Sequence, residues 1–280
     1  VLWSTGFIAS KIGGDYAEPF TFLSIRFAIA AGLLIPALFV GERLSVRAAS
    51  NAALVGALIH SGYIGCVMWA LRQGMPAGVV AMLVCLQPLA TALLAGPFLG
   101  EQISRRHWIG LALGLAGAVM VLAPKLDLGA NSIEPGAFEP MAVVATLVAL
   151  ASITLGTLYQ KATGSEGSLT QIAFYQYVGA TAVSMTLAFT TETRNVDWTM
   201  EFTLALVWLV VLLSIGAIGL LLMMIRASAV SRVTSLFYLV PATTALMGWA
   251  LLGDHLEPVQ LLGMAAVMAA VAMIRGWKRS

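Results

Sequence analysis

Ten apolar stretches of membrane-spanning length follow one another along this chain, and the second five resemble the first five. The sequence is 60% hydrophobic and 10% charged, whereas soluble domains have about 25% charged residues. A helix needs about 20 apolar residues to cross the hydrocarbon core of a bilayer. We therefore predict an all-α membrane protein with ten transmembrane helices, built as two inverted five-helix repeats around a central cavity.

The predicted helices are joined by short connections that leave no room for a soluble domain. We expect a truncated N-terminus, because the chain opens at Val1 inside an apolar stretch and lacks an initiator Met. The first repeat covers 1–124, a Gly/Pro/Asn-rich outer loop covers 125–138, and the second repeat covers 139–280. The expected helices are 1–13, 18–40, 51–71, 76–98, 105–124, 139–161, 169–190, 202–224, 231–252 and 257–275.

Loop charges predict the orientation of these helices. With a cytoplasmic N-terminus, the inner loops and tail hold ten of the 15 basic residues, the outer loops hold four, and Arg26 lies inside the second helix. Ten of the 13 acidic residues fall on the outer side. Cytoplasmic loops are enriched in Lys and Arg, so both termini are predicted to be cytoplasmic, in a multi-pass protein of the inner membrane.

The internal repeat is visible as matched residues at a constant offset. A shift of 153 residues places Pro88 on Pro241, and Leu99-Gly100-Glu101 on Leu252-Gly253-Asp254. A shift of 150 places Lys11 on Lys161. Chance agreement among Ala, Leu and Gly is the alternative, but matched prolines and a matched Leu-Gly-acidic step argue against it.

These residues carry a resemblance to a known family. Trp3-Ser4-Thr5-Gly6-Phe7 through Lys11, the Arg26-Phe27 step, and Pro88-Leu89 followed by Leu99-Gly100-Glu101 resemble the EamA-type repeats of the drug/metabolite transporter superfamily. Pro241-Ala242 and Leu252-Gly253-Asp254 repeat part of the pattern. The resemblance implies a ten-helix exporter of small metabolites. The stretches 74–78 and 86–91 look most similar to amino-acid exporters, including exporters of aromatic amino acids.

Polar residues inside a membrane are costly and point to function. His60 and Tyr63 lie about 60° apart on one face of the third predicted helix, beside Gly56 and Val67. A His and a Tyr next to a small residue suit a polar niche in a substrate cavity. The alternative is a hydrogen bond between helices, which small and polar interface residues also support.

The fourth and ninth predicted helices each contain a proline, which removes a backbone hydrogen bond. Gln87 precedes Pro88 and is predicted to contact substrate or the freed carbonyl group. Tyr238 lies shortly before Pro241 and is a second candidate for substrate binding. Paired helix breaks point to a transport site, so Pro88 and Pro241 are predicted hinges or gates, with static kinks as the alternative.

Three further residues are candidates on weaker grounds. Arg26 is predicted to be a structural intramembrane charge, and binding of a substrate carboxylate is the alternative. Trp3 and Tyr159 supply aromatic surface for a substrate, although Trp and Tyr also gather at membrane interfaces.

The acidic residues all fall in loops or at the ends of spans, and the first helix contains no glutamate of the kind that small multidrug exporters use. These features argue against coupled exchange of cationic drugs and favour a neutral or zwitterionic solute moving down its gradient. Cys66 and Cys85 lie in apolar runs without metal-ligand spacing. We expect no cofactor and no metal.

The sequence thus predicts a secondary transporter that exports small metabolites, most of all amino acids, by alternating access. Its partners would be a small-molecule substrate and membrane lipids, without nucleic acid; the oligomeric state stays open, with a monomer as one option. The alternatives are a lipid or lipid-linked solute flippase, a channel, or an intramembrane hydrolase at His60-Ser61. The hydrolase is disfavoured because G-x-S-x-G, H-E-x-x-H and buried paired carboxylates are absent, so we expect no enzyme.

Overall fold

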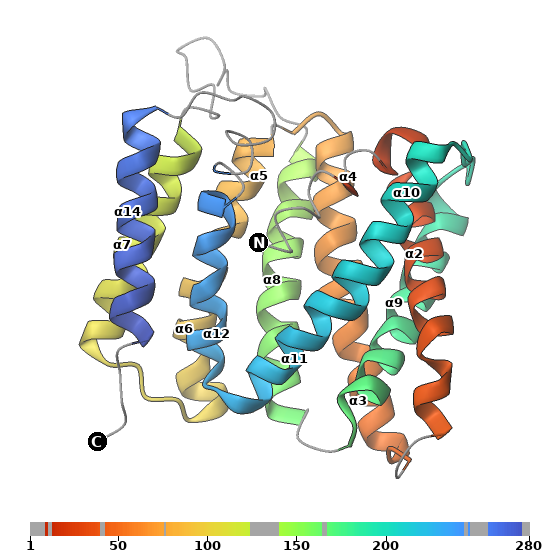
Figure 1. The fold of residues 1–280 in the computed structure, drawn as a ribbon, viewed down its shortest axis with the longest axis horizontal. Coiled ribbons are helices and arrows are strands. Elements are labelled where there is room, and N and C mark those ends of the chain that lie inside the picture. The colour runs from red at the N-terminus through yellow and green to blue at the C-terminus, as the bar shows by residue number, and fades with distance from the viewer. Residues whose placement is uncertain are drawn as a thin grey trace.

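The computed structural model describes residues 9–10, 13–39, 43–75, 77–123, 140–163, 167–243, 246 and 257–275. These residues are nearly all helical, and the only strand pairing among them is one isolated antiparallel bridge between Ala17 and Val196 (Figure 1). The predicted helix 1–13, and with it Trp3, lies almost wholly outside the described residues. The helical elements are α2 (Pro19–Leu34), η1 (Ile35–Phe39), α3 (Val46–Gly56), η2 (Ala57–Gly65), α4 (Cys66–Arg72), α5 (Ala77–Val84), α6 (Gln87–Leu99), α7 (Arg105–Leu122), α8 (Pro140–Thr163), α9 (Leu169–Thr191), α10 (Met200–Trp208), η4 (Leu209–Ala217), α11 (Ile218–Ala227), α12 (Val230–Ser235), η5 (Leu236–Tyr238) and α14 (Pro258–Arg275).

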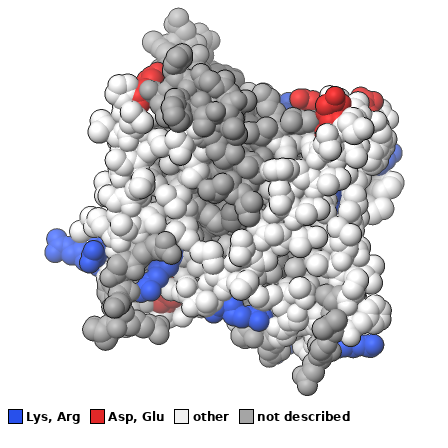
Figure 2. All heavy atoms as spheres, viewed as in Figure 1, with Lys and Arg blue, Asp and Glu red and all other residues white. Residues whose placement is uncertain are grey.

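Five helical segments in the described chain are long and apolar enough to cross a membrane, and two shorter helices are also apolar. Figure 2 shows an almost uncharged band across the molecule, with most acidic side chains at its upper end and most basic side chains at its lower end. The five spans are 46–72, 79–99, 140–163, 169–191 and 200–227, and the shorter apolar helices are 19–34 and 258–274.

Capping residues decide where several helices begin. The Ser45 hydroxyl accepts a hydrogen bond from the Ala48 amide, so α3 starts five residues before the predicted position 51. Thr199 caps α10 in the same way. Gly100 ends α6 with a φ of 67°, a left-handed conformation that a side chain disfavours.

Two of the long helices contain π-helical segments of nine residues each, η2 and η4. Their first residues, Ala57 and Leu209, are 152 positions apart, close to the offsets of 150 and 153 in the sequence repeat. A turn at Cys85–Leu86, just before Pro88, interrupts the helical segment 77–99. A 3₁₀ turn at Leu236–Tyr238, just before Pro241, interrupts the α-helical segment that begins at Val230. Such irregularities in the helical hydrogen bonding often mark functional positions.

Helix packing does not follow the two halves of the sequence. Elements α2, α3, η2, α9, α10, η4 and α11 pack together as one unit, the α2–α9 bundle, and α6, α7, α12 and α14 pack as a second, the α7–α14 bundle. Figure 1 shows them on opposite sides of the molecule, with α8 between. Each bundle therefore combines helices of both predicted repeats.

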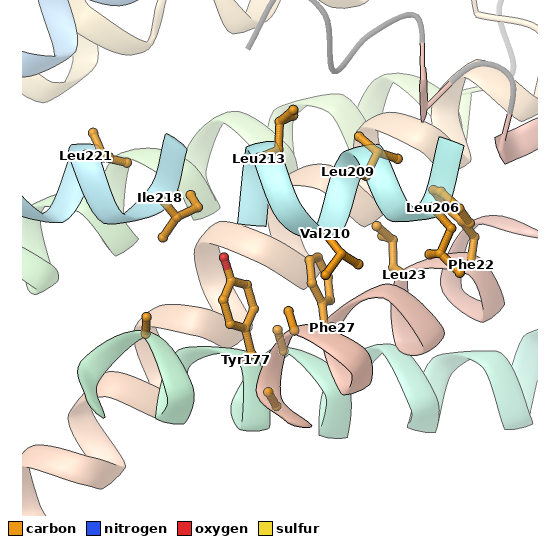
Figure 3. Close-up of a cluster of buried hydrophobic side chains, with 14 of the residues drawn as sticks. Phe22, Leu23, Phe27, Tyr177, Leu206, Leu209, Val210, Leu213, Ile218 and Leu221 are labelled. Atoms are coloured by element: carbon orange, nitrogen blue, oxygen red, sulfur yellow. The ribbon is translucent and has the colours of Figure 1, made fainter. Parts of the chain in front are cut away.

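Close helix crossings and aromatic packing hold each bundle together. A Cβ at Gly117 of α7 would lie 2.7 Å from the carbonyl oxygen of Gly263 in α14, so only glycine permits this approach. In the α2–α9 bundle, Phe27 and Tyr177 lie side by side beneath η4, within a cluster of buried apolar side chains (Figure 3).

Carboxylates clasp the ends of both bundles. In the α2–α9 bundle, Glu192 accepts hydrogen bonds from the amides of Phe20 and Thr21, and Glu18 accepts them from the amides of Thr193 and Arg194. In the α7–α14 bundle, Glu101 accepts a hydrogen bond of 2.8 Å from the Val230 amide and another of 2.7 Å from the Ser231 hydroxyl. Each clasp ties a residue before position 125 to one after position 139.

Candidate functional site

A cavity of about 30 Å³ lies where α8 meets the α2–α9 bundle and η5. Both π-helical segments contribute to its wall. It is lined by Arg26, Ile59, His60, Tyr63, Ile64, Ile153, Thr157, Leu213, Ile218, Leu221 and Phe237. Three polar residues singled out from the sequence, Arg26, His60 and Tyr63, thus meet in one apolar chamber.

A tight helix crossing positions His60. A Cβ at Gly56 would collide with the backbone of Gln176, so α3 and α9 approach closely one turn before His60. The imidazole then stacks on Tyr177, with 5.0 Å between ring centroids, and lies 5.5 Å from the Phe27 ring. The ring is 2% exposed, and its Nε2 atom has no hydrogen-bond partner in the described part of the chain.

Arg26 reaches the cavity from α2 and is 4% exposed. Its Nε–H donates to the Ser214 hydroxyl at 3.1 Å, and the Tyr177 hydroxyl donates to the carbonyl oxygen of the same serine. The guanidinium carbon lies 5.4 Å from the centre of the Phe27 ring. Within the described residues, no carboxylate forms an ion pair with Arg26.

The other predicted residues occupy different surroundings. Gln87 is buried at the start of α6, and Tyr238 is buried in the α7–α14 bundle. The Tyr238 ring fills the space beside Gly114. Tyr159 donates a hydrogen bond of 2.9 Å to Asn51, and its side chain is absent from the wall of the cavity.

Pro88 lies in the first turn of α6, directly after the interruption at Cys85–Leu86. Cys85 packs against the buried cluster of the α7–α14 bundle that contains Tyr238. The break before Pro88 therefore adjoins the interior of that bundle. Pro241 follows η5 within a helical stretch that is described to residue 243.

Buried polar atoms without a described partner continue along α6 and η5. They are Gln87 Nε2, Thr91 Oγ1 and the Tyr238 hydroxyl. Buried polar groups normally have a partner in the protein or in ordered water. These atoms are therefore available to a solute or to water that enters between the helices.

Sequence reasoning missed Ser214, Thr157 and Phe237 as neighbours of the site, and it did not group Tyr177 with His60. Ser214 lies in η4, and the π-helical register that turns it toward Arg26 has no readable signal in the sequence. Tyr177 belongs to a different predicted repeat from His60, so only helix packing brings the two rings together.

Over the ranges that the structure describes, no group of three or more His, Cys, Asp or Glu side chains is placed to hold an ion.

The sequence of this chain is similar to a family of transporters and to proteins named as transporters or efflux pumps. The profile of the EamA-like transporter family matches residues 1–123 and 140–276. An Escherichia coli protein named "uncharacterized inner membrane transporter YedA" is 26% identical over 98% of this chain and 87% of its own length. A Salmonella typhimurium protein named "probable amino-acid metabolite efflux pump" is 24% identical, over 97% of this chain and 90% of its own.

Two further similarities extend this result. A Streptantibioticus cattleyicolor protein named "probable terminal-alkyne amino-acid exporter" is 27% identical over 98% of this chain and 90% of its own. A protein of known crystal structure shares the fold with a TM-score of 0.78 at 19% identity, over 98% of this chain and 93% of its own.

Proposed function

Because this chain belongs to the EamA-like transporter family, we propose that it exports amino acids or closely related metabolites across the inner membrane. The relatives named as an amino-acid metabolite efflux pump and an amino-acid exporter support this substrate class. The family and these names indicate a membrane transporter rather than an enzyme.

The observation that carries the proposal is the meeting of Arg26, His60 and Tyr63 in one cavity whose other lining residues, apart from Thr157, are apolar. The polar groups suit the charged end of an amino acid, and the Ile, Leu and Phe side chains around them suit an apolar or aromatic side chain. Gln87, Thr91 and Tyr238 would extend this surface along the break before Pro88 when the helices separate.

We propose transport by alternating access, with the two mixed bundles as the moving bodies. Each bundle has its own close crossings and its own carboxylate clasp, whereas α8 packs against elements of both. A cavity of about 30 Å³ holds one or two water molecules rather than an amino acid. Substrate would therefore enter only when the bundles move apart, with the breaks before Pro88 and Pro241 absorbing the change in helix geometry.

We propose that this transporter has ten membrane spans, arranged as two inverted repeats of five, with both termini cytoplasmic. The π-helical segments 152 positions apart and the paired breaks support the repeat. The charge distribution over the face in Figure 2 supports the orientation, because basic side chains gather at the end that would face the cytoplasm. Among the described residues that line the cavity none is acidic, which favours movement of solute down its gradient over coupling through a buried carboxylate.

Uptake of labelled amino acids into liposomes tests the proposal directly. The purified protein is reconstituted, and a panel of amino acids is measured with and without a pH gradient. We expect uptake of at least one apolar or aromatic amino acid, independent of the gradient. Absence of uptake for every member would refute the substrate class, and dependence on the gradient would refute uncoupled movement.

A matched pair of variants tests the position of the site. Tyr63→Phe and Tyr159→Phe each remove one hydroxyl group, but only Tyr63 lines the cavity. We expect uptake to fall in Tyr63→Phe and to persist in Tyr159→Phe at equal amounts of folded protein. The reverse result would move the site to the end of α8 near Asn51.

A further inference from the structure

We propose that Arg26 binds the carboxylate group of the transported solute, so that the carrier selects carboxylate-bearing solutes with an apolar remainder and excludes amines that lack an acid group. This inference rests on the proposed function, because it assumes that the cavity described above is where the solute binds. It assigns Arg26 a binding role in place of the structural role that the sequence suggested.

The first argument is that the positive charge of Arg26 is buried without an anion. Its side chain lies in an apolar helix and is 4% exposed. In the described part of the chain, its Nε–H has a neutral partner, Ser214, and its two terminal nitrogens have no hydrogen-bond partner. A charge at such a position is costly unless it is paired, so an anion entering the cavity gains an unusually strong interaction.

The second argument is that the guanidinium group is already held in place. The Ser214 hydroxyl fixes the Nε edge, the Tyr177 hydroxyl holds the backbone of Ser214, and the Phe27 ring lies beside the group at 5.4 Å. These contacts leave the two terminal nitrogens for the cavity that Arg26 lines. A fixed guanidinium fork matches a carboxylate through two parallel hydrogen bonds.

The third argument concerns the rest of the cavity wall. Apolar contact to the side chain of a solute comes from Ile153, Leu213, Leu221 and Phe237. No acidic residue is among the described residues that line the cavity. An ammonium group therefore finds repulsion from Arg26 and no compensating charge. The wall favours an acid with an apolar substituent, and it requires no amino group for recognition.

Four probes that share one aromatic ring separate these features. L-phenylalanine and phenylacetate carry a carboxylate, whereas L-phenylalaninamide and phenethylamine do not. Each probe competes with labelled substrate in liposomes and is also tested for thermal stabilisation of the purified protein in detergent. We expect both acids to compete and to stabilise, and the amide and the amine to do neither.

Variants then connect this selectivity to Arg26. Arg26→Gln removes the charge and is expected to weaken binding of both acids roughly tenfold to hundredfold, the range for loss of a hydrogen bond to a charged group. Arg26→Lys keeps the charge without the fork and is expected to lie between. Arg47→Gln alters an exposed arginine at the start of α3 and is expected to bind the acids as the native protein does.

Ser214→Ala is the second route if Arg26→Gln does not fold. It keeps the charge and removes the contact that orients Nε, so acid binding should weaken several-fold while the preference for acids over the amide remains. Equal competition by the amide and the phenylacetate in the native protein would overturn the inference. Unchanged acid binding in folded Arg26→Gln would do the same.

The outcome for the proposed function is separate. If no amino acid is transported but phenylacetate stabilises the native protein and not Arg26→Gln, the substrate class of the proposed function fails and the role of Arg26 stands. If phenylalanine is transported equally by both proteins, export of amino acids stands and the role of Arg26 fails.

Discussion

The clasp at Glu192 yields a prediction whose size follows from the structure. Its two carboxylate oxygens accept hydrogen bonds from the Phe20 amide at 2.8 Å, and from the Thr21 amide and hydroxyl at 2.7 Å each. These amides begin α2 and have no partner within the helix. Glu192→Ala removes these three hydrogen bonds between the end of α9 and the start of α2.

The expected cost is about 2 to 3 kcal/mol. Loss of a capping side chain costs about 0.5–2 kcal/mol, and a hydrogen bond to a charged group contributes about 1.5–3 kcal/mol. Adding the full value of three such hydrogen bonds would overestimate the loss in free energy of unfolding. Glu192 is only partly buried, so water replaces part of this hydrogen bonding in the variant. Phe20 and Thr21 are 6% and 5% exposed, so water reaches their amide groups incompletely when Glu192 is removed. The loss in free energy of unfolding therefore lies above the usual range for a capping residue.

Thermal unfolding of the purified protein in detergent measures this cost. A loss of about 2 kcal/mol corresponds to a decrease of roughly 4–8 °C in midpoint for a chain of this size. Glu201→Ala is the control, because Glu201 is an exposed acidic residue in the first turn of α10 and has no such clasp. Equal unfolding temperatures for the two variants would show that the clasp contributes little, and would remove it as a reason why α2 and α9 move together.

Three further outcomes are expected. Burial raises the pKa of Glu18, but the hydrogen bonds from Thr193 and Arg194 and the charge of Arg72 together outweigh burial and hold that pKa below 4.5. The stability that Glu18 contributes is therefore present above the pKa of the unfolded chain and is lost as pH falls through the lower folded pKa. The unfolding midpoint should fall with acidification below about pH 5, and by less in Glu18→Gln than in the native protein. Gly117→Leu should abolish folded protein in gel filtration, because its side chain would collide with α14. Gly32→Leu should elute normally, because no atom of another part of the chain lies within 4 Å of a Cβ placed at Gly32. Loss of folded protein in both variants would contradict the packing argument.

Helix positions were largely predictable because apolar length is a local property of the chain. The predicted segments 105–124, 139–161, 169–190 and 257–275 agree with α7, α8, α9 and α14 to within two residues at each end. The start of α3 was placed at 51 rather than Val46, because Ser45 caps a first turn that extends beyond the apolar stretch. The π-helical segments were not predicted, since no residue type marks them.

The candidate site was predictable only in part. His60 and Tyr63 could be grouped because they share one face of one helix, and the structure places both at the cavity. For Arg26 the sequence predicts a structural role, and it gives no sign of the neutral partner Ser214, which lies 188 positions away along the chain. Tyr159 and Tyr238 are aromatic residues of suitable type, but their contacts lie with Asn51 and with Gly114.

The sequence by itself determined that this chain forms apolar helices for a membrane, because hydrophobicity over about 20 residues settles that outcome without reference to distant residues. It also indicated two similar halves and the breaks before Pro88 and Pro241. Only the tertiary structure decided how those halves combine. Glycine contacts, carboxylate clasps and aromatic stacking join residues more than 100 positions apart, and they assemble two mixed bundles around α8. Such contacts depend on which helix faces meet in space, and for that reason the pairing of Arg26 with Ser214 and of His60 with Tyr177 could not be obtained from the order of residues.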